Sequence, residues 1–170
     1  TRPFYSRVLS SISHVVIGTF DSPYFQGDPA LPDEDAHFHL DFKNGTGDIR
    51  HDQGHFWLYV PKKTSTAQQP FKPVVFGHGY GGSSADIYAF AGFFAQQGLA
   101  SISIDYPQHQ INLPPTQLGL VSSILGGACL APLAEEALKG RAYDRDGDGQ
   151  YDSGWWYWTP HLFRTRDNVR

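Results

Sequence analysis

The sequence has a single cysteine and no cluster of positive charge. Because Cys129 is the only cysteine among 170 residues, the chain cannot form an internal disulfide, and we expect this thiol to be a buried apolar filler. The formal net charge is −4, from 13 Lys and Arg residues and 17 Asp and Glu residues. Electrostatics therefore favour neither nucleic acid nor an anionic membrane surface as a partner, and a small molecule or a polymer is the expected substrate.

Long apolar runs are also missing. The first eleven residues, TRPFYSRVLSS, lack the basic start and apolar core of a signal peptide, so none is expected in this chain. Residues 111–134 carry no charge, but prolines and glycines break this stretch, and we expect no transmembrane segment, which needs roughly 20 apolar residues. This stretch predicts a buried helical pair, with an apolar lid or acyl-contacting wall as the alternative.

The N-terminal third of the chain has the composition of β-strands. Residues 14–20, 37–42 and 55–61 are rich in β-branched and aromatic residues and lie between turn-rich segments. They predict a small N-terminal β region, which together with the first strands of the next region spans residues 1–62.

A strand, a helix and a second strand follow in order. The apolar run at residues 73–79 predicts a central strand, the helical spacing at 85–97 predicts a helix, and the alternation at 99–107 predicts another strand. Short links between them indicate a parallel crossover unit. The sequence therefore predicts an α/β fold, with its core in residues 63–170.

The segment YDRDGDGQYDSG, residues 143–154, is the most specific short motif. Five residues match the first nine positions of an EF-hand loop: Asp144, Asp146, Asp148, Gly149 and Asp152. Carboxylates this close repel one another unless a hard cation lies among them, and the glycine allows the Gln150 carbonyl to turn inward. The loop resembles the shorter calcium loops of dockerins and thrombospondin-type repeats.

A structural calcium ion is the cofactor predicted for residues 144–155, with Asp144, Asp146, Asp148, Gln150 and Asp152 as ligands. Trp155 stands where an EF-hand has its bidentate Glu, so another ligand or water would complete the shell. A solvated acidic turn is the alternative. Calcium at extracellular concentrations suits such weak sites, which favours a secreted or periplasmic protein.

The segment HGYGG, residues 78–82, lies between the predicted apolar strand and the predicted helix. It resembles the oxyanion-hole segment of α/β-hydrolases, the loop after their third strand. The resemblance implies that Gly79 and Gly81 let the backbone approach a substrate carbonyl, while the Tyr80 N–H faces the charge that develops on its oxygen. His78 is then expected to fix the loop, because the catalytic base of that fold comes late in the chain.

The similarity extends over most of residues 54–170. The segment SISIDYPQHQ, residues 101–110, corresponds to strand four of those hydrolases and the loop after it, although Gln108 stands where a glycine is usual. With the acidic loop, the chain resembles bacterial α/β-hydrolases of the lipase and esterase type, including those with an extra N-terminal β domain. The resemblance implies a fold that is the first part of an α/β-hydrolase sheet, preceded by a small N-terminal β region. It also implies that the substrate is a small-molecule or lipid ester.

The nucleophile elbow of that fold, Gly-x-Ser-x-Gly, does not occur in the sequence. Ser83, in GGSSA, follows its strand too late to be an elbow and is expected to cap the helix. The preferred hypothesis is therefore that the chain is the N-terminal part of a serine hydrolase whose Ser, acid and His come from a C-terminal segment or a second chain of the same precursor. In the family order, the elbow would come after a helix that starts at Thr165.

Two other hypotheses stay open. One is a calcium-stabilised module that binds a glycan or a partner without catalysis, using a patch made by Trp155, Trp156 and Trp158. Those tryptophans could instead line an acyl pocket, and packing under the acidic loop is the default expectation for them. The other is a complete small hydrolase that uses Ser83 with Asp152 and His161.

Overall fold

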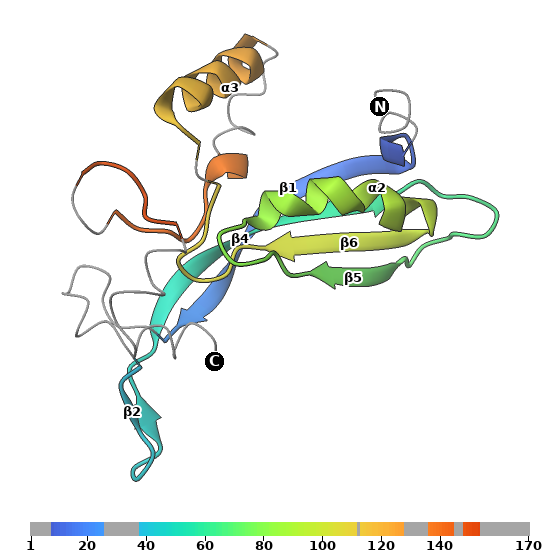
Figure 1. Ribbon diagram of the computed structural model, residues 1–170. Helices are drawn as coiled ribbons and strands as arrows, with labels where there is room; N and C mark the ends of the chain where they lie inside the picture. The colour runs from blue at the N-terminus through green and yellow to red at the C-terminus, as the bar shows by residue number, and fades with distance from the viewer. Residues whose placement is uncertain (1–7, 26–37, 112, 128–135, 145–147, 154–170) are drawn as a thin grey trace.

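The computed structural model describes residues 8–25, 38–111, 113–127, 136–144 and 148–153. Within these ranges, four strands form one mixed sheet and two short strands form a separate hairpin (Figure 1). The sheet contains β1 (Ile12–Tyr24), β4 (Arg50–Pro61), β5 (Lys72–Phe76) and β6 (Leu99–Ile104), and the hairpin contains β2 (Leu40–Asp41) and β3 (Thr46–Gly47). The helices are the 3-10 helix η1 (Ser84–Ile87) and the α-helices α2 (Tyr88–Gln96) and α3 (Pro115–Gly127). The described fold is thus loosely α/β, a mixed sheet with few helices.

The strand order in the sheet is β1-β4-β6-β5. β1 and β4 form a long antiparallel ladder, from Ile12 opposite Pro61 to Tyr24 opposite Arg50. β4 pairs antiparallel with β6, whereas β5 runs parallel to β6. Parallel neighbours need a crossover, and η1 with α2 supplies it. The crossover unit expected from the sequence is therefore confirmed, and the sheet continues across residue 62 because β4 pairs with β6.

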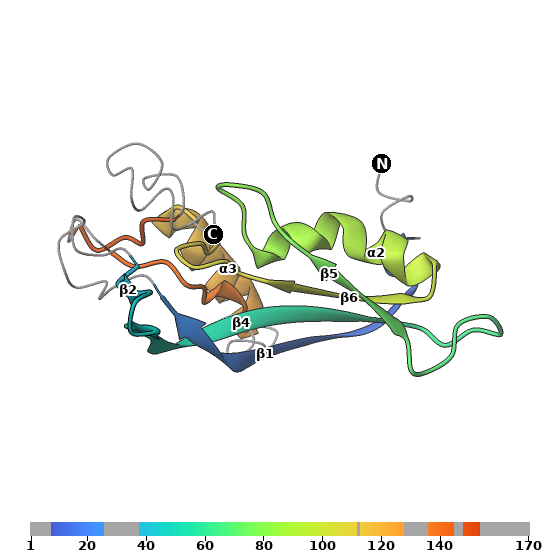
Figure 2. The same ribbon diagram turned by 90° about the horizontal axis from the view of Figure 1, so that it is seen from below.

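Alternation along β4 gives the sheet two different faces. Tyr59 is buried against Ile87 and Ala91, and Trp57 packs beside them, so this face lies under α2 (Figure 2). Successive side chains of a strand point to opposite faces, so the residues between them point away from α2. Apolar residues of that second face include Phe56, Leu58, Val60, Val75, Ile102 and Ile104. Among the described residues α2 is the α-helix that covers the sheet, and α3 stands apart from it (Figure 1).

Two glycines in the β1–β4 ladder are covered by aromatic rings. Gly18 lies opposite Phe56, and Gly54 lies opposite Phe20. A Cβ atom added to Gly18 would be 2.7 Å from Phe56 Cζ, and one added to Gly54 would be 2.4 Å from Phe20 Cζ. The rings thus occupy the space that side chains at the glycines would need, which shields these parts of the backbone and favours this register.

The remaining predictions are only partly confirmed. The strand expected at 37–42 is reduced to the two residues of β2, because Asp41 Oδ1 accepts the backbone N–H groups of Lys43 and Asn44 and so turns the chain. The helix expected from residue 85 begins with the 3-10 turn η1.

The buried helical pair expected at 111–134 is wrong for its described part. A single helix, α3, occupies residues 115–127 there, and its Leu118, Leu120 and Ile124 side chains are exposed. None of the described helices has the length and apolar character that crossing a bilayer requires.

Candidate functional site

A tight turn follows β5 and contains three of the predicted site residues. The Gly82 N–H donates to the Gly79 oxygen at 2.9 Å, and Gly81, the third residue of the turn, has a φ of +72°. A turn with positive φ at this position favours glycine strongly. The predicted residues Gly79, Tyr80 and Gly81 therefore lie together at the carboxyl end of a parallel strand.

A second turn of the same kind follows β6. The His109 N–H donates to the Tyr106 oxygen at 3.0 Å, Pro107 is the second residue, and Gln108 has a φ of +66°. The left-handed conformation costs a non-glycine residue roughly 1–2 kcal/mol. Gln108 is fully buried, its N–H donates to the Arg141 oxygen at 3.0 Å, and its side-chain amide donates to the Tyr24 hydroxyl. These contacts hold Gln108 in the conformation that a glycine would adopt without strain.

The two turns lie against each other. The His78 ring is 4.5 Å from the Tyr106 ring and 4.9 Å from the His109 ring, measured between centroids. The Tyr80 ring, which is half exposed, meets His109 edge-on at 6.4 Å. The Tyr106 N–H also donates to His78 Nε2 at 3.1 Å. An aromatic cluster and a hydrogen bond therefore join the loop after β5 to the loop after β6.

Asp105, directly after β6, is a buried acid with a partner on the glycine-rich loop. Its side chain accepts the Ser84 N–H at 2.7 Å and the Ser84 hydroxyl at 2.8 Å. Burial raises the pKa of Asp105, and the hydrogen bonds from Ser84 oppose that rise. Asp105 thereby attaches the start of η1 to the end of β6.

The turn after β6 is also attached to the segment around Arg141. The Arg141 N–H donates to the His109 oxygen at 2.8 Å, and Arg141 Nε is 2.7 Å from Asp52 Oδ2 on β4. Both side chains of this ion pair are largely buried. The His109 Nδ1 lies 3.0 Å from the Pro107 oxygen, and burial lowers the pKa of His109.

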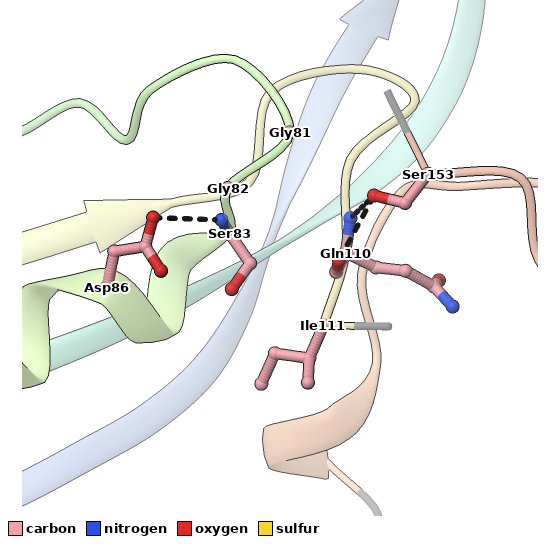
Figure 3. Close-up of a pocket in the computed structure, with 7 residues that line it drawn as sticks. All are labelled: Gly81, Gly82, Ser83, Asp86, Gln110, Ile111 and Ser153. Carbon is pink, nitrogen blue, oxygen red and sulfur yellow. Dashed lines mark hydrogen bonds between the residues drawn. The ribbon is translucent and has the colours of Figure 1, made fainter. Parts of the chain in front are cut away.

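A cavity of about 490 Å³ opens beside the first turn (Figure 3). Its lining residues are Gly81, Gly82, Ser83, Asp86, Gln110, Ile111 and Ser153. A Cβ atom at Gly82 would lie 2.2 Å from Asp86 Oδ2, so only glycine fits that part of the wall without a shift of the carboxylate. On the opposite wall, Ser153 Oγ donates to the Gln110 oxygen and accepts the Gln110 N–H, both at 3.1 Å.

Ser83 is the N-cap residue of η1, as expected from the sequence. It forms a capping box with Asp86, whose Oδ2 accepts the Ser83 N–H at 3.4 Å. Ser83 is largely buried but touches the cavity. Its proposed triad partner His161 lies outside the described residues.

Several residues at this site were not predicted from the sequence. Asp105, Gln110 and Ser153 lie within segments that the sequence singled out, but the sequence assigned them no role at the site. Their contacts span 21 residues of chain for Asp105 with Ser84 and 43 residues for Gln110 with Ser153. For Asp86 the sequence offered one indication, because this acid stands in the first turn of a predicted helix, where a negative charge is favourable.

The acidic loop is described in part. Asp144, Asp148, Gln150 and Asp152 lie in described residues, whereas Asp146 and Trp155 lie outside them. The Gly149 N–H donates to Asp144 Oδ2 at 2.9 Å, and Gly149 has the left-handed φ of +86° that a sharp turn favours. The loop is closed by an antiparallel bridge between Tyr143 and Asp152.

Within the part of the chain that the structure describes, no three His, Cys, Asp or Glu side chains are grouped so that they could hold a metal ion. The calcium site therefore stays a prediction. The turn at Gly149 is compatible with such a loop.

Fold and site together define a protein with a mixed, loosely α/β sheet, whose cavity adjoins a glycine-rich turn at the carboxyl end of a parallel strand pair. The chain was also compared with protein-family models, with curated proteins and with solved structures, and none of the three comparisons found a match.

Proposed function

We propose that this chain is the oxyanion-hole-bearing N-terminal part of a serine hydrolase that cleaves carboxylic esters. The observation that carries the proposal is the cavity of about 490 Å³ against Gly81 and Gly82. Ligands of open α/β sheets bind beyond the carboxyl ends of the strands, and this cavity has that position relative to β5 and β6. Backbone at glycine can approach a ligand closely, because there is no side chain in the way.

The chemistry of the proposal is acyl transfer. A serine supplied by a C-terminal segment or a second chain of the same precursor attacks the ester carbonyl, and the histidine of that segment takes the serine proton. Negative charge develops on the carbonyl oxygen, and the Tyr80 N–H stabilises it by a hydrogen bond. The same histidine then protonates the leaving alcohol, and water releases the acid from the serine.

The described sheet supports the need for a further segment. β5 is the last strand in the sheet order, although β5 and β6 are parallel and parallel strands are usually covered on both faces. Val75, near the middle of β5, is 74% exposed. An apolar edge and an apolar face of this kind are stable when another strand and helix cover them. The C-terminal hydrolase segment is the occupant that we propose for both.

A serine-directed fluorophosphonate tests the proposal on the native sample, read by intact mass spectrometry. Label on a second polypeptide, with this 18.9 kDa chain unmodified, is the expected result. Label on this chain would instead favour Ser83 and a compact catalytic unit. No label on any polypeptide would contradict the hydrolase and favour the calcium-stabilised binding module.

Calcium in the acidic loop is a separate part of the proposal, and it accompanies a secreted or periplasmic location. Asp144, Asp148 and Asp152 supply oxygen donors, which a hard cation prefers, and calcium would fix the loop next to Ser153 on the cavity wall. A calcium ion that binds only the folded chain stabilises it by about 2.7 kcal/mol at a free calcium concentration 100 times Kd.

Chelation with EGTA is therefore expected to lower the melting temperature, and added calcium is expected to restore it. Asp148→Asn should weaken the response, whereas the exposed Asp48→Asn provides a control with the same change of charge. An unchanged melting temperature on chelation would contradict calcium binding.

A further inference from the structure

The peptide between Gly79 and Tyr80 is held by two hydrogen-bond donors. The Gly79 oxygen is 2.9 Å from His78 Nδ1 and also accepts the Gly82 N–H at 2.9 Å. Because a carbonyl oxygen can only accept, His78 Nδ1 carries the proton in this contact. The C=O and N–H of a trans peptide point in opposite directions. Fixing the Gly79 oxygen therefore fixes the direction of the Tyr80 N–H, which points away from both donors.

The other nitrogen of the same ring is bound to the end of β6. The Tyr106 N–H donates to His78 Nε2 at 3.1 Å, so Nε2 is unprotonated and acts as the acceptor. Each ring nitrogen of a neutral His78 thus has a partner of the correct polarity. The ring links the backbone after β6 to the peptide that carries the Tyr80 N–H, and it is itself buried.

The far end of the glycine-rich loop has a second attachment. Asp105, which is 1% exposed, accepts both the N–H and the hydroxyl of Ser84. Asp105 and Tyr106 are consecutive, so residues 78 and 84 at the two ends of the loop are bound to neighbouring residues of one rigid strand end. Gly77 lets the Tyr106 side chain pack closely against the loop, because a Cβ atom at Gly77 would lie 2.2 Å from the Tyr106 hydroxyl oxygen.

We propose that the two attachments of the loop, His78 to Tyr106 and Ser84 to Asp105, set the direction of the Tyr80 N–H, and we call them the two-point brace. His78 and Asp105 are then positioning residues for the oxyanion. The inference rests on the proposed function and deepens it. Preorganised donors stabilise a developing charge more than donors that must reorient during the reaction. A brace that acts from β6 supplies this preorganisation, because the glycine-rich turn has little conformational preference of its own.

The brace itself can be tested without any activity. In the purified protein, long-range ¹H–¹⁵N correlation spectra report the tautomer of the His78 ring, and a ¹⁵N–¹⁵N coupling across the hydrogen bond reports the contact with Tyr106. We expect the Nδ1–H tautomer and a measurable coupling between Tyr106 N and His78 Nε2. The Nε2–H tautomer, or a missing coupling, would overturn the brace.

Two substitutions of the same histidine separate its two contacts. His78→Gln places its amide near the former Nε2, so it keeps an acceptor for Tyr106 and loses the donor to Gly79. His78→Asn places its amide near the former Nδ1 and keeps that donor. In the complete enzyme acting on a 4-nitrophenyl ester, we expect His78→Gln to lower kcat by roughly 10- to 100-fold. This loss is smaller than the fall in kcat of about 10²–10³ that follows removal of a whole oxyanion-hole donor.

In the same assay KM should change little, and His78→Asn should keep more of kcat than His78→Gln. His51→Gln, at an exposed histidine of β4, is the matched control, and melting temperatures identify variants that fail to fold. Asp105→Asn keeps one acceptor oxygen and should also lower kcat with little change in KM. Equal losses in both His78 variants, or a rise in KM alone, would overturn the positioning role. If the wild-type enzyme transfers no acyl group, the proposed function fails, and the ring spectra still decide whether the brace exists.

Discussion

The sheet under α2 and the turns beyond its carboxyl ends are stabilised by different interactions. Tyr59, Ile87 and Ala91 form an apolar core between the sheet and α2. Beyond β6, most of the buried side chains are instead polar, and they include Asp105, Gln108 and Arg141. Apolar burial is non-directional, whereas buried polar groups must be matched atom by atom. We therefore expect the loss of one partner of a buried polar pair to cost more than a small change in the apolar core, unless the same substitution relieves backbone strain.

The largest effect is expected from removing one partner of the buried ion pair. Arg141→Met leaves Asp52 largely buried without its partner, and breaking such a pair costs about 3–5 kcal/mol of unfolding free energy. Urea denaturation measures the loss. The double variant Arg141→Met with Asp52→Leu should recover most of it, because two apolar groups can replace a buried pair. If Arg141→Met were as stable as the wild type, the buried polar groups beyond β6 would not depend on their partners, and the comparison would fail.

The next effect concerns activity and leaves stability nearly unchanged. Tyr80 is the second residue of its turn, where proline is favoured, so Tyr80→Pro removes the N–H and keeps the turn. In the complete enzyme, loss of this donor should lower kcat by about 10²–10³. Tyr80→Ala, which keeps the N–H, is the control for loss of the ring contact with His109. Unchanged turnover in Tyr80→Pro would refute the role of this N–H.

A milder effect is expected on the apolar side of the comparison. Ile87, the last residue of η1, is fully buried in the core with Tyr59 and Ala91, and Ile87→Val removes one methylene from this core. The loss of unfolding free energy should be about 0.5–1.5 kcal/mol, as is typical for this change. The His78 ring spectrum and kcat should stay as in the wild type, since Ile87 contacts neither turn through a hydrogen bond. A change in kcat beyond the loss of folded protein would mean that the two regions are coupled.

The smallest effect is expected at the strained position. Gln108→Gly relieves the left-handed strain but removes the hydrogen bond to Tyr24 and leaves a small cavity. The opposing contributions are similar in size, so the unfolding free energy should change by no more than about 1 kcal/mol. Tyr24→Phe is the companion variant, since it removes only the hydroxyl. A large loss in Gln108→Gly alone would show that packing of the Gln108 side chain outweighs its strain.

The sequence predicted most of the regular structure. Alternation and aromatic content located β1 and β4, and the spacing of apolar residues located the crossover of β5, α2 and β6. The same rules were wrong for residues 115–127 of the uncharged stretch, where apolar composition suggested burial and α3 leaves Leu118, Leu120 and Ile124 exposed. Composition states what a segment could bury, and the neighbouring elements decide whether it is buried.

For the candidate site, the sequence by itself determined the glycine-rich turn, its place after an apolar strand and the cap at Ser83, because these depend on local backbone preferences. Only the tertiary structure brought Ser153 to Gln110 and Arg141 to Asp52, which are 43 and 89 residues apart. It also decided that Gln108 adopts a glycine-like conformation, since the contacts with Tyr24 and Arg141 offset the strain. Such contacts join residues without any local pattern, and they form only once the sheet has set the ends of its strands side by side.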